Sequence, residues 1–243
     1  MHRLKLYTKA VVFVVFLGIS IPVFAATTAD NSFQDWLKSF YPIVAKQGIS
    51  RSLYERAFSG VRTPDSDVLR KAAYQPEFTK KIWDYLDTGV NPVTVANGRA
   101  VAGTYRRWLD TLEARFGVES SVLLAIWSME SGYGAVLQRP GRLHYVPRAL
   151  ATLAYADTSR RRFGEKQLIA ALKIVQNGDV SFDQLYGSWA GAMGHTQFIP
   201  TSYLAYGVDM DKDGRRDIWN SVPDALGTVA NLLSKNGWRT GTE

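Results

Sequence analysis

The sequence predicts a mainly α-helical protein. Segments of helical length recur along the chain, and clusters of Gly, Pro, Asn and Asp separate them. No segment shows a convincing alternation of apolar and polar residues, which is the pattern of a half-buried β-strand. Because 46% of the 243 residues are hydrophobic and seven are tryptophans, the chain can build a sizeable core.

The expected helices follow one another through short connections. They cover residues 33–46, 50–58, 65–71, 76–85, 98–116, 119–130, 148–156, 163–176, 181–185 and 223–236. The pattern breaks over residues 90–97, where Pro92 interrupts it, and a helix is expected to resume at Gly98. We therefore expect an N-terminal helical region over 26–97 and a second unit over 98–243, with no internal repeat.

The N-terminus predicts export. Three basic residues precede an apolar stretch over 10–24, and residues 23–25 read Val-Phe-Ala, which suits signal peptidase cleavage after Ala25. Residues 1–25 are thus expected to be a signal peptide that directs the protein to the periplasm. Gly18, Ser20 and Pro22 argue against a long spanning helix, and a retained membrane anchor is the alternative. The chain has no cysteine, so it cannot form disulfides.

The charge balance narrows the class of partner. The formal net charge is +7, which suits an anionic polymer. Nucleic acid is not expected, because no basic run accompanies a nucleic-acid-binding motif. Arg160, Arg161 and Arg162 form the only basic cluster in the sequence. They are either a solvated helix start or contacts to carboxylates.

Glu130 is the strongest catalytic candidate. It ends the apolar run 122–129, and Ser131-Gly132-Tyr133-Gly134 follows at once, so its carboxyl group should lie in the last turn of a buried helix. The negative end of the helix dipole and an apolar setting both raise the pKa of a carboxyl group. A protonated carboxylic acid near neutral pH can act as a general acid. The structural alternative is a glutamate that caps the helix end.

Residues 187–203 form the second informative block. The segment contains small residues that allow close approach of backbone or ligand, together with polar groups and aromatic rings. This mixture suits a sugar, which presents hydroxyl edges and C–H faces. The alternative is a tight contact between helices. The polar and aromatic residues are Ser188, Trp189, His195, Thr196, Gln197, Phe198 and Tyr203.

A third feature is an acidic loop. Asp209, Asp211 and Asp213 alternate and Gly214 follows them, as in the first half of an EF-hand calcium loop. The glutamate that usually closes such a loop is replaced by Asn220. The sequence favours a structural Ca²⁺ site here, with the backbone carbonyl of Arg215 as a further ligand, over a polar turn that holds no metal.

Together these blocks resemble the B-type lytic murein transglycosylases, which have a lysozyme-like core. The resemblance covers most of the chain, from about Phe33 to Trp238. The matching motifs are residues 125–134, Gly191-Ala192-Met193-Gly194 with Gln197-Phe198-Ile199-Pro200, Gln75-Pro76-Glu77-Phe78, and Asn236-Gly237-Trp238.

The resemblance implies a lysozyme-like catalytic core over 98–243 and activity on peptidoglycan glycan strands. Glu130 would protonate the glycosidic oxygen between N-acetylmuramic acid and N-acetylglucosamine. The 6-hydroxyl of the N-acetylmuramic acid would then close a 1,6-anhydro ring. Candidate substrate contacts are Ser188, Gln197, Tyr133, Arg160, Arg161 and His195. The calcium loop would span 209–224, with Asp224 as a later ligand.

Two departures from the family pattern bear on these expectations. Family members commonly continue beyond Trp238, whereas this sequence ends at Glu243. His195 occupies a place where the family often has tyrosine. A hydrolytic muramidase that uses the same glutamate and an inactive peptidoglycan-binding module are the alternatives to a lytic transglycosylase.

Overall fold

The computed structural model describes residues 25–74, 89–139 and 141–241, with side chains from Ser32 onward. The described chain is mainly helical, as predicted. Its helices are α1 (Ala25–Ala45), α2 (Arg51–Ala57), α3 (Ser66–Ala73), α5 (Pro92–Thr104), α6 (Arg106–Phe116), α7 (Ser120–Ser131), the 3₁₀ helix η2 (Ala135–Gln138), α8 (Val146–Ala156), α9 (Arg161–Gln176), α10 (Pro200–Tyr206) and α11 (Val222–Lys235). The two strands are β1 (His144–Tyr145) and β2 (Tyr186–Gly187), which pair antiparallel.

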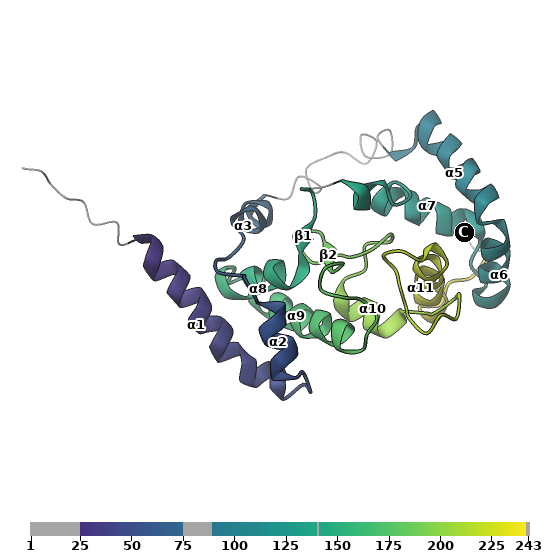
Figure 1. The fold of residues 1–243 in the computed structure, drawn as a ribbon. Coiled ribbons are helices and arrows are strands. Elements are labelled where there is room, and N and C mark those ends of the chain that lie inside the picture. The colour runs from purple at the N-terminus through teal and green to yellow at the C-terminus, as the bar shows by residue number, and fades with distance from the viewer. Residues whose placement is uncertain (1–24, 75–88, 140, 242–243) are drawn as a thin grey trace, which may run out of the picture.

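The α8–α9 pair lies at the centre of the molecule (Figure 1). Helices α1, α2 and α3 pack on one side of this pair, and α10 packs against α9. On the other side, α5, α6, α7 and α11 form a second group. Helix α10 contacts both α9 and α11, and so connects this group to the centre. The β1–β2 pair lies between the two groups, and β1 leads directly into the N-terminal end of α8.

One continuous apolar core runs through both groups of helices. It joins Phe33 of α1 to Leu150 of α8 and Leu168 of α9, and continues to Trp127 of α7 and Leu226 of α11. All five side chains are at most 2% exposed, so their burial supplies much of the hydrophobic stabilisation. This core fixes α7, and therefore Glu130, relative to the centre of the fold.

The start of α5 corrects the expected break at 90–97. Asn91 caps this helix, because its side-chain oxygen accepts hydrogen bonds from the N–H groups of Val93 and Thr94, and Pro92 takes the first helical position. The single helix expected over 98–116 is also wrong, because the chain turns at Tyr105 and divides it into α5 and α6. Residue 97 therefore lies inside a helix, and a domain boundary there stays a prediction.

Three other expectations differ from the structure. Residues 181–185 form a turn instead of a helix, because the chain there leads directly into β2. The sequence does not predict the short helix α10 or the antiparallel pair β1–β2, since two-residue strands are too short to show an alternating pattern. The predicted signal peptide, the helix over 76–85 and the Gln75-Pro76-Glu77-Phe78 motif lie outside the described residues, apart from Ala25 at the start of α1.

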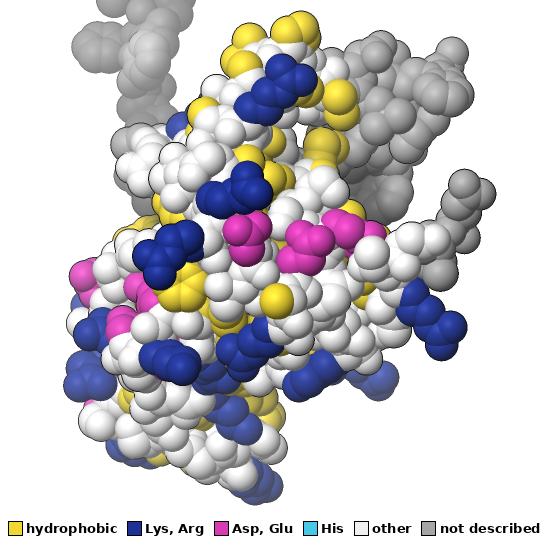
Figure 2. Space-filling model, turned by 90° about the vertical axis from the view of Figure 1, so that its right-hand side faces the viewer, with side chains coloured by type: hydrophobic (Ala, Val, Ile, Leu, Met, Phe, Trp, Pro, Cys, Tyr) yellow, Lys and Arg dark blue, Asp and Glu magenta, His cyan; other side chains and the backbone are white. Residues whose placement is uncertain are grey.

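Helix α5 is largely exposed. None of its residues is buried. Hydrophobic side chains gather at the top of the face shown in Figure 2, where α5 lies. Val93 and Val95 are 69% and 42% exposed, and Val90 just before the helix is 61% exposed. Among the described residues, no helix is both long enough and apolar enough to span a membrane.

The close contact between α8 and α9 depends on Gly164. A Cβ at this position would lie 2.6 Å from the backbone nitrogen of Ala154 and 2.8 Å from the carbonyl oxygen of Leu150. We expect Gly164→Ala to lower the free energy of unfolding by about 1–3 kcal/mol, as overpacking of a tight core does, measured by urea denaturation. Gly103→Ala is the matched control, because that helical site has no atom within 4 Å. A stabilising effect of Gly164→Ala would contradict this packing.

Candidate active site

Glu130 lies in the last turn of α7, as predicted. The helix ends at Gly132, whose backbone N–H donates to the carbonyl oxygen of Ser128 at 2.8 Å. Gly132, Tyr133 and Gly134 follow one another with φ angles of 58°, 57° and 87°. Three successive left-handed residues turn the chain sharply away from the helix, and glycine at two of them keeps the cost low.

Partial burial raises the pKa of the Glu130 carboxyl above its ordinary value. Glu130 is nonetheless an exposed residue, so its carboxyl group is accessible from solvent. Within the described residues, Glu130 makes no hydrogen bond or ion pair and no other charge shifts its pKa. Desolvation alone thus favours the protonated acid that a general acid requires.

The turn after Glu130 is held by a segment far away in the sequence. The hydroxyl of Ser131 donates to the backbone carbonyl of His195 at 2.5 Å and accepts from the N–H of Gly134 at 2.9 Å. Ser131 is 1% exposed, so its two hydrogen bonds are shielded from solvent. Sequence reasoning did not assign a role to Ser131, and its place directly after Glu130 was the only available signal.

Trp127 lies beneath the turn at the centre of three aromatic contacts. Its indole N–H donates to Nδ1 of His195 at 3.1 Å. The rings of Tyr105, Tyr133 and His195 meet the indole edge-on, with centroids 5.8, 5.4 and 5.5 Å away. The Tyr133 hydroxyl approaches Gly98 of α5 so closely that a Cβ there would lie 2.6 Å from it. The turn that carries Glu130 is therefore held between α5 and the His195 segment.

The glycine-rich segment 187–198 folds back on itself. Met193 bridges to Gly187 and to Phe198, and Phe198 exchanges backbone hydrogen bonds with Met193 at 2.9 and 3.0 Å. The Ser188 hydroxyl oxygen accepts from the N–H groups of Ala190 and Ala192 at 3.3 and 3.0 Å. Ser188 thus organises the loop, and no hydrogen bond to Glu130 is present among the described residues.

Gln197 has an unusual backbone conformation. Its φ angle is 50°, which non-glycine residues rarely adopt. Its amide nitrogen donates to the carbonyl oxygen of Gly194 at 2.9 Å, and its amide oxygen accepts no hydrogen bond within the described chain. Such strain often occurs at ligand-binding positions.

The structure distinguishes Arg160 from Arg161, the two arginines of the basic cluster that are candidate substrate contacts. Arg160 pairs with Asp157 at 2.9 Å and lies over the ring of Trp189, 5.7 Å from its centroid. Arg160 therefore adjoins the glycine-rich segment. Arg161, the first residue of α9, is exposed and forms no ion pair with another described residue.

A carboxylate partner for Glu130 is not found among the described residues. Asp157 is bonded to Arg160 and Ser159. Glu165 lies on α9 beside Lys166, in a surface groove of about 460 Å³ with Arg162 and Lys173. Asp183 lies in the turn before β2. None of the three contributes to the pKa of Glu130.

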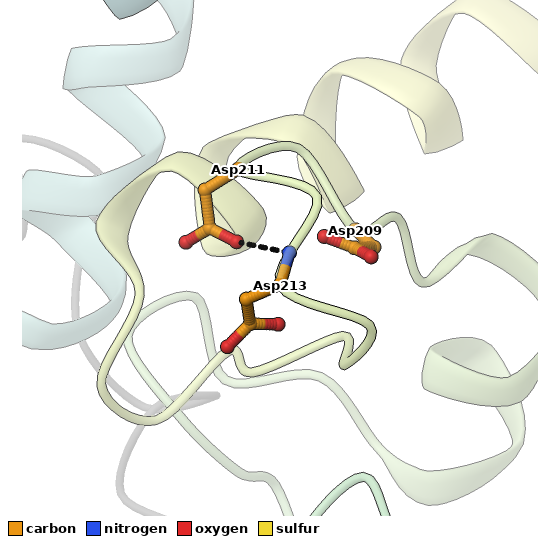
Figure 3. Close-up of side chains that lie close together, drawn as sticks. All are labelled: Asp209, Asp211 and Asp213. Carbon is orange, nitrogen blue, oxygen red and sulfur yellow. Dashed lines mark hydrogen bonds between the residues drawn. The ribbon is translucent and has the colours of Figure 1, made fainter.

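The acidic loop brings its three aspartates together (Figure 3). One carboxylate oxygen from each of Asp209, Asp211 and Asp213 lies within 4.8 Å of the others. The backbone N–H of Asp213 donates to Asp211 at 3.3 Å, and that of Gly214 donates to Asp209 at 2.9 Å. The other oxygen of Asp209 is buried and has no hydrogen-bond partner. Clustered hard oxygens with an orphaned buried carboxylate oxygen fit a bound Ca²⁺.

Asp224 is not part of this cluster. It is fully buried in the first turn of α11, and its carboxylate accepts hydrogen bonds from the N–H groups of Met210, Asp211 and Asp217, at 2.6, 3.4 and 2.8 Å. Burial raises its pKa to about 6. These hydrogen bonds make Asp224 a brace that fixes the acidic loop to α11, and its expected role as a metal ligand stays a prediction. Arg215 donates its N–H to Asp213 at 2.8 Å.

A helical fold that presents a partly desolvated glutamate at a helix end, opposite a strained glycine-rich loop, defines a lysozyme-like protein. Comparison with known proteins gives the family. Residues 32–243 match the family described as Transglycosylase SLT domain, and the chain belongs to this family.

Named relatives agree with this assignment. The chain is 30% identical over 210 residues to membrane-bound lytic murein transglycosylase B of Escherichia coli, which covers 83% of this chain and 56% of that protein. The structure of SltB3 from Pseudomonas aeruginosa in complex with NAG-anhNAM-pentapeptide is 45% identical, with a TM-score of 0.81, and covers 86% of this chain and 54% of that one. The Escherichia coli lytic transglycosylase Slt35 in complex with calcium is 28% identical, with a TM-score of 0.73, and covers 88% and 65% of the two chains. The chain thus spans little more than half the length of the first two.

The raised pKa of Glu130 predicts a pH-dependent stability difference. Because the folded state holds the proton more tightly than the unfolded state, ionisation destabilises the fold as pH rises through the folded pKa. We expect Glu130→Gln to raise the melting temperature at pH 7. The gain should vanish below the ordinary glutamate pKa of about 4.3, where both states are protonated.

Glu55→Gln on α2 is the matched control, because its side chain is 63% exposed and its change should matter little at either pH. Thermal unfolding followed by circular dichroism gives the difference. An equal melting temperature for Glu130→Gln and the unmodified protein at pH 7 would contradict the desolvated carboxyl group.

Proposed function

We propose that this protein is a lytic transglycosylase. It cleaves the β-1,4 bond between N-acetylmuramic acid and N-acetylglucosamine in peptidoglycan and leaves a 1,6-anhydro-N-acetylmuramic acid end. The observation that carries this proposal is Glu130, an accessible and desolvated carboxyl group whose pKa no neighbouring charge shifts within the described chain. The membership in the SLT domain family supports the reaction class.

The first step uses the protonated carboxyl group. Glu130 gives its proton to the glycosidic oxygen, and the bond from this oxygen to the anomeric carbon breaks. N-acetylglucosamine leaves with a free 4-hydroxyl. Retaining and inverting hydrolases ordinarily need a second carboxylate. Here the acetamide of the muramic sugar stabilises the anomeric carbon instead, so one protein carboxyl group suffices.

The second step uses the ionised carboxylate. Glu130 takes the proton from the 6-hydroxyl of the same muramic sugar, and the oxygen attacks the anomeric carbon. The ring closes, no water is consumed, and Glu130 is protonated again. A partly desolvated carboxyl group suits both steps, because its pKa lies nearer to the working pH than that of an ordinary glutamate.

Residues around Glu130 supply candidate contacts to the glycan. The free amide oxygen of Gln197 can accept from a sugar hydroxyl or acetamide N–H, and the Ser188 hydroxyl can still donate. Tyr133 offers a phenolic edge beside Glu130. Arg160, with Arg161 beyond it, suits the carboxylates of the peptide stems.

The acidic loop is proposed to hold a structural Ca²⁺ through Asp209, Asp211 and Asp213, with the Arg215 carbonyl as a further ligand. The two positive charges of the cation would offset most of the charge of three clustered carboxylates and fix the loop against α11. The buried, unpartnered oxygen of Asp209 supports this proposal. The calcium complex of Slt35, a relative of the same fold, supports it as well.

Periplasmic localisation after export follows from the signal-like N-terminal sequence, and the curated relative is named as membrane-bound. The proposed partner is peptidoglycan alone, with no nucleic acid. A membrane contact is expected only if the N-terminal segment is retained.

The chemistry predicts the behaviour of a Glu130 variant. Glu130→Gln keeps the shape of the side chain but cannot donate or accept the proton. We expect its release of muropeptides from purified sacculi to fall by at least about 10²–10⁴-fold, the usual contribution of general acid–base catalysis. Glu55→Gln should retain normal release. Near-normal turnover by a folded Glu130→Gln protein would show that another group is the acid.

The origin of the attacking oxygen separates the possible enzymes. Digestion of sacculi in heavy-oxygen water should yield anhydro ends with no label, as measured by mass spectrometry. Labelled reducing ends would instead identify a hydrolytic muramidase. Binding without any release by a folded protein would identify a peptidoglycan-binding module.

Calcium should stabilise the fold by binding to the native state. A Ca²⁺ concentration ten times the dissociation constant contributes about 1.4 kcal/mol, which corresponds to a rise in melting temperature of about 3–6 °C. Asp211→Asn should abolish this rise, whereas Asp35→Asn on α1, 70% exposed, should leave it intact. A melting temperature that does not respond to millimolar Ca²⁺ would refute the site.

A further inference from the structure

His195 contacts the residues on both sides of Glu130. Its Nδ1 accepts from the Trp127 indole N–H at 3.1 Å, three residues before Glu130. Its backbone carbonyl accepts from the Ser131 hydroxyl at 2.5 Å, directly after Glu130. Its imidazole also fills the space above Gly134, where a Cβ would clash with the ring. One residue of the glycine-rich segment thus meets positions 127, 131 and 134 of the turn that presents the acid.

His195 is itself firmly anchored. Its backbone N–H donates to the carbonyl oxygen of Ile218 at 3.0 Å. A Cβ at the preceding Gly194 would lie 2.5 Å from that same carbonyl oxygen, so the two segments are in close contact. The contact between Gly194 and Ile218 therefore helps to fix the position of the turn that carries Glu130.

The hydrogen bond from Trp127 determines the protonation state of His195. An indole N–H is a donor only, so Nδ1 must carry a lone pair and the imidazole must be neutral, with its proton on Nε2. A protonated imidazolium would place two N–H groups opposite each other and would break the bond. Burial lowers the pKa of His195, against a smaller opposing effect of Asp217, and this agrees with a neutral ring.

The titratable groups around the ring come from three elements. Asp217 lies in the segment before α11 and is the charge that acts on the imidazole. Glu130 is the ionisable group of the α7 turn. Tyr133 and Tyr105 meet the Trp127 indole from the turn and from the α5–α6 junction.

We propose that His195 is a positioning residue for Glu130: its neutral imidazole fixes the Trp127 indole and the 131–134 turn, and protonation of the imidazole releases them. The inference rests on the proposed function for its catalytic consequence only. The structure directs Nδ1 at Trp127, and the expected role of His195 as a substrate contact stays a prediction.

Two variants separate the hydrogen bond from the bulk of the ring. His195→Phe keeps a ring but removes the acceptor. His195→Asn keeps an uncharged acceptor near the place of Nδ1 and cannot become an imidazolium. We expect kcat to fall about tenfold in His195→Phe, the effect of losing about one hydrogen bond, with KM changed less than twofold. His195→Asn should recover most of this loss, and its activity should lose less toward acidic pH than that of the unmodified protein.

The direct test is nuclear magnetic resonance of the full chain with ¹⁵N-labelled tryptophan, in which Trp127→Phe assigns the Trp127 indole N–H signal. This signal should titrate with a midpoint below the ordinary histidine pKa of about 6.5, and should not do so in His195→Asn. It should exchange faster with solvent in His195→Phe. Trp36 of α1 is the internal control and should not respond to either variant.

A Trp127 signal that is unaffected by pH and by His195→Phe would overturn the proposal, as would an unchanged kcat in His195→Phe. The spectroscopic measurement needs no turnover. A protein that shows the titration but cleaves no glycan would thus retain the Trp127–His195 contact while refuting the proposed function.

Discussion

The structure around Glu130 depends on three successive left-handed residues. Each left-handed non-glycine residue costs about 1–2 kcal/mol, and the sequence places glycine at two of the three positions, 132 and 134. Tyr133 bears the remaining cost, and its ring is held against the Trp127 indole and α5. This turn ends α7 abruptly, so the carboxyl group of Glu130 stands at the helix end, where hydration is incomplete and the surface is still within reach.

The rest of the fold holds this turn from two directions. Trp127 belongs to the continuous core that reaches back to α8 and α9, whereas His195 belongs to a loop that is pinned by its bridges to β2. The acidic loop and its brace Asp224 stabilise the segment that ends at Ile218, which in turn anchors His195. A proposed calcium ion in that loop would therefore affect catalysis indirectly, through the packing of these segments. It would not touch the substrate.

The sequence predicted the local features well. The apolar run followed by two glycines identified the helix end at Glu130, and the alternating aspartates identified the acidic loop. The sequence did not predict the features that depend on tertiary contacts. The roles of Ser131 and His195 depend on a contact between segments 64 residues apart. The brace Asp224 and the two-residue strands likewise leave no periodic signal. The start of α5 was missed for another reason: the Asn91 cap with Pro92 was interpreted as a break instead of a helix start.

In the proposed reaction, Glu130 alone carries the chemistry, as an acid that desolvation keeps protonated at higher pH than usual. The most direct test is a titration of its side-chain carboxyl carbon by nuclear magnetic resonance, in protein labelled with ¹³C-glutamate and assigned with Glu130→Gln. We expect one transition, with a pKa above the ordinary glutamate value. A pKa at or below that value, or two coupled transitions that reveal a second carboxyl group, would contradict it.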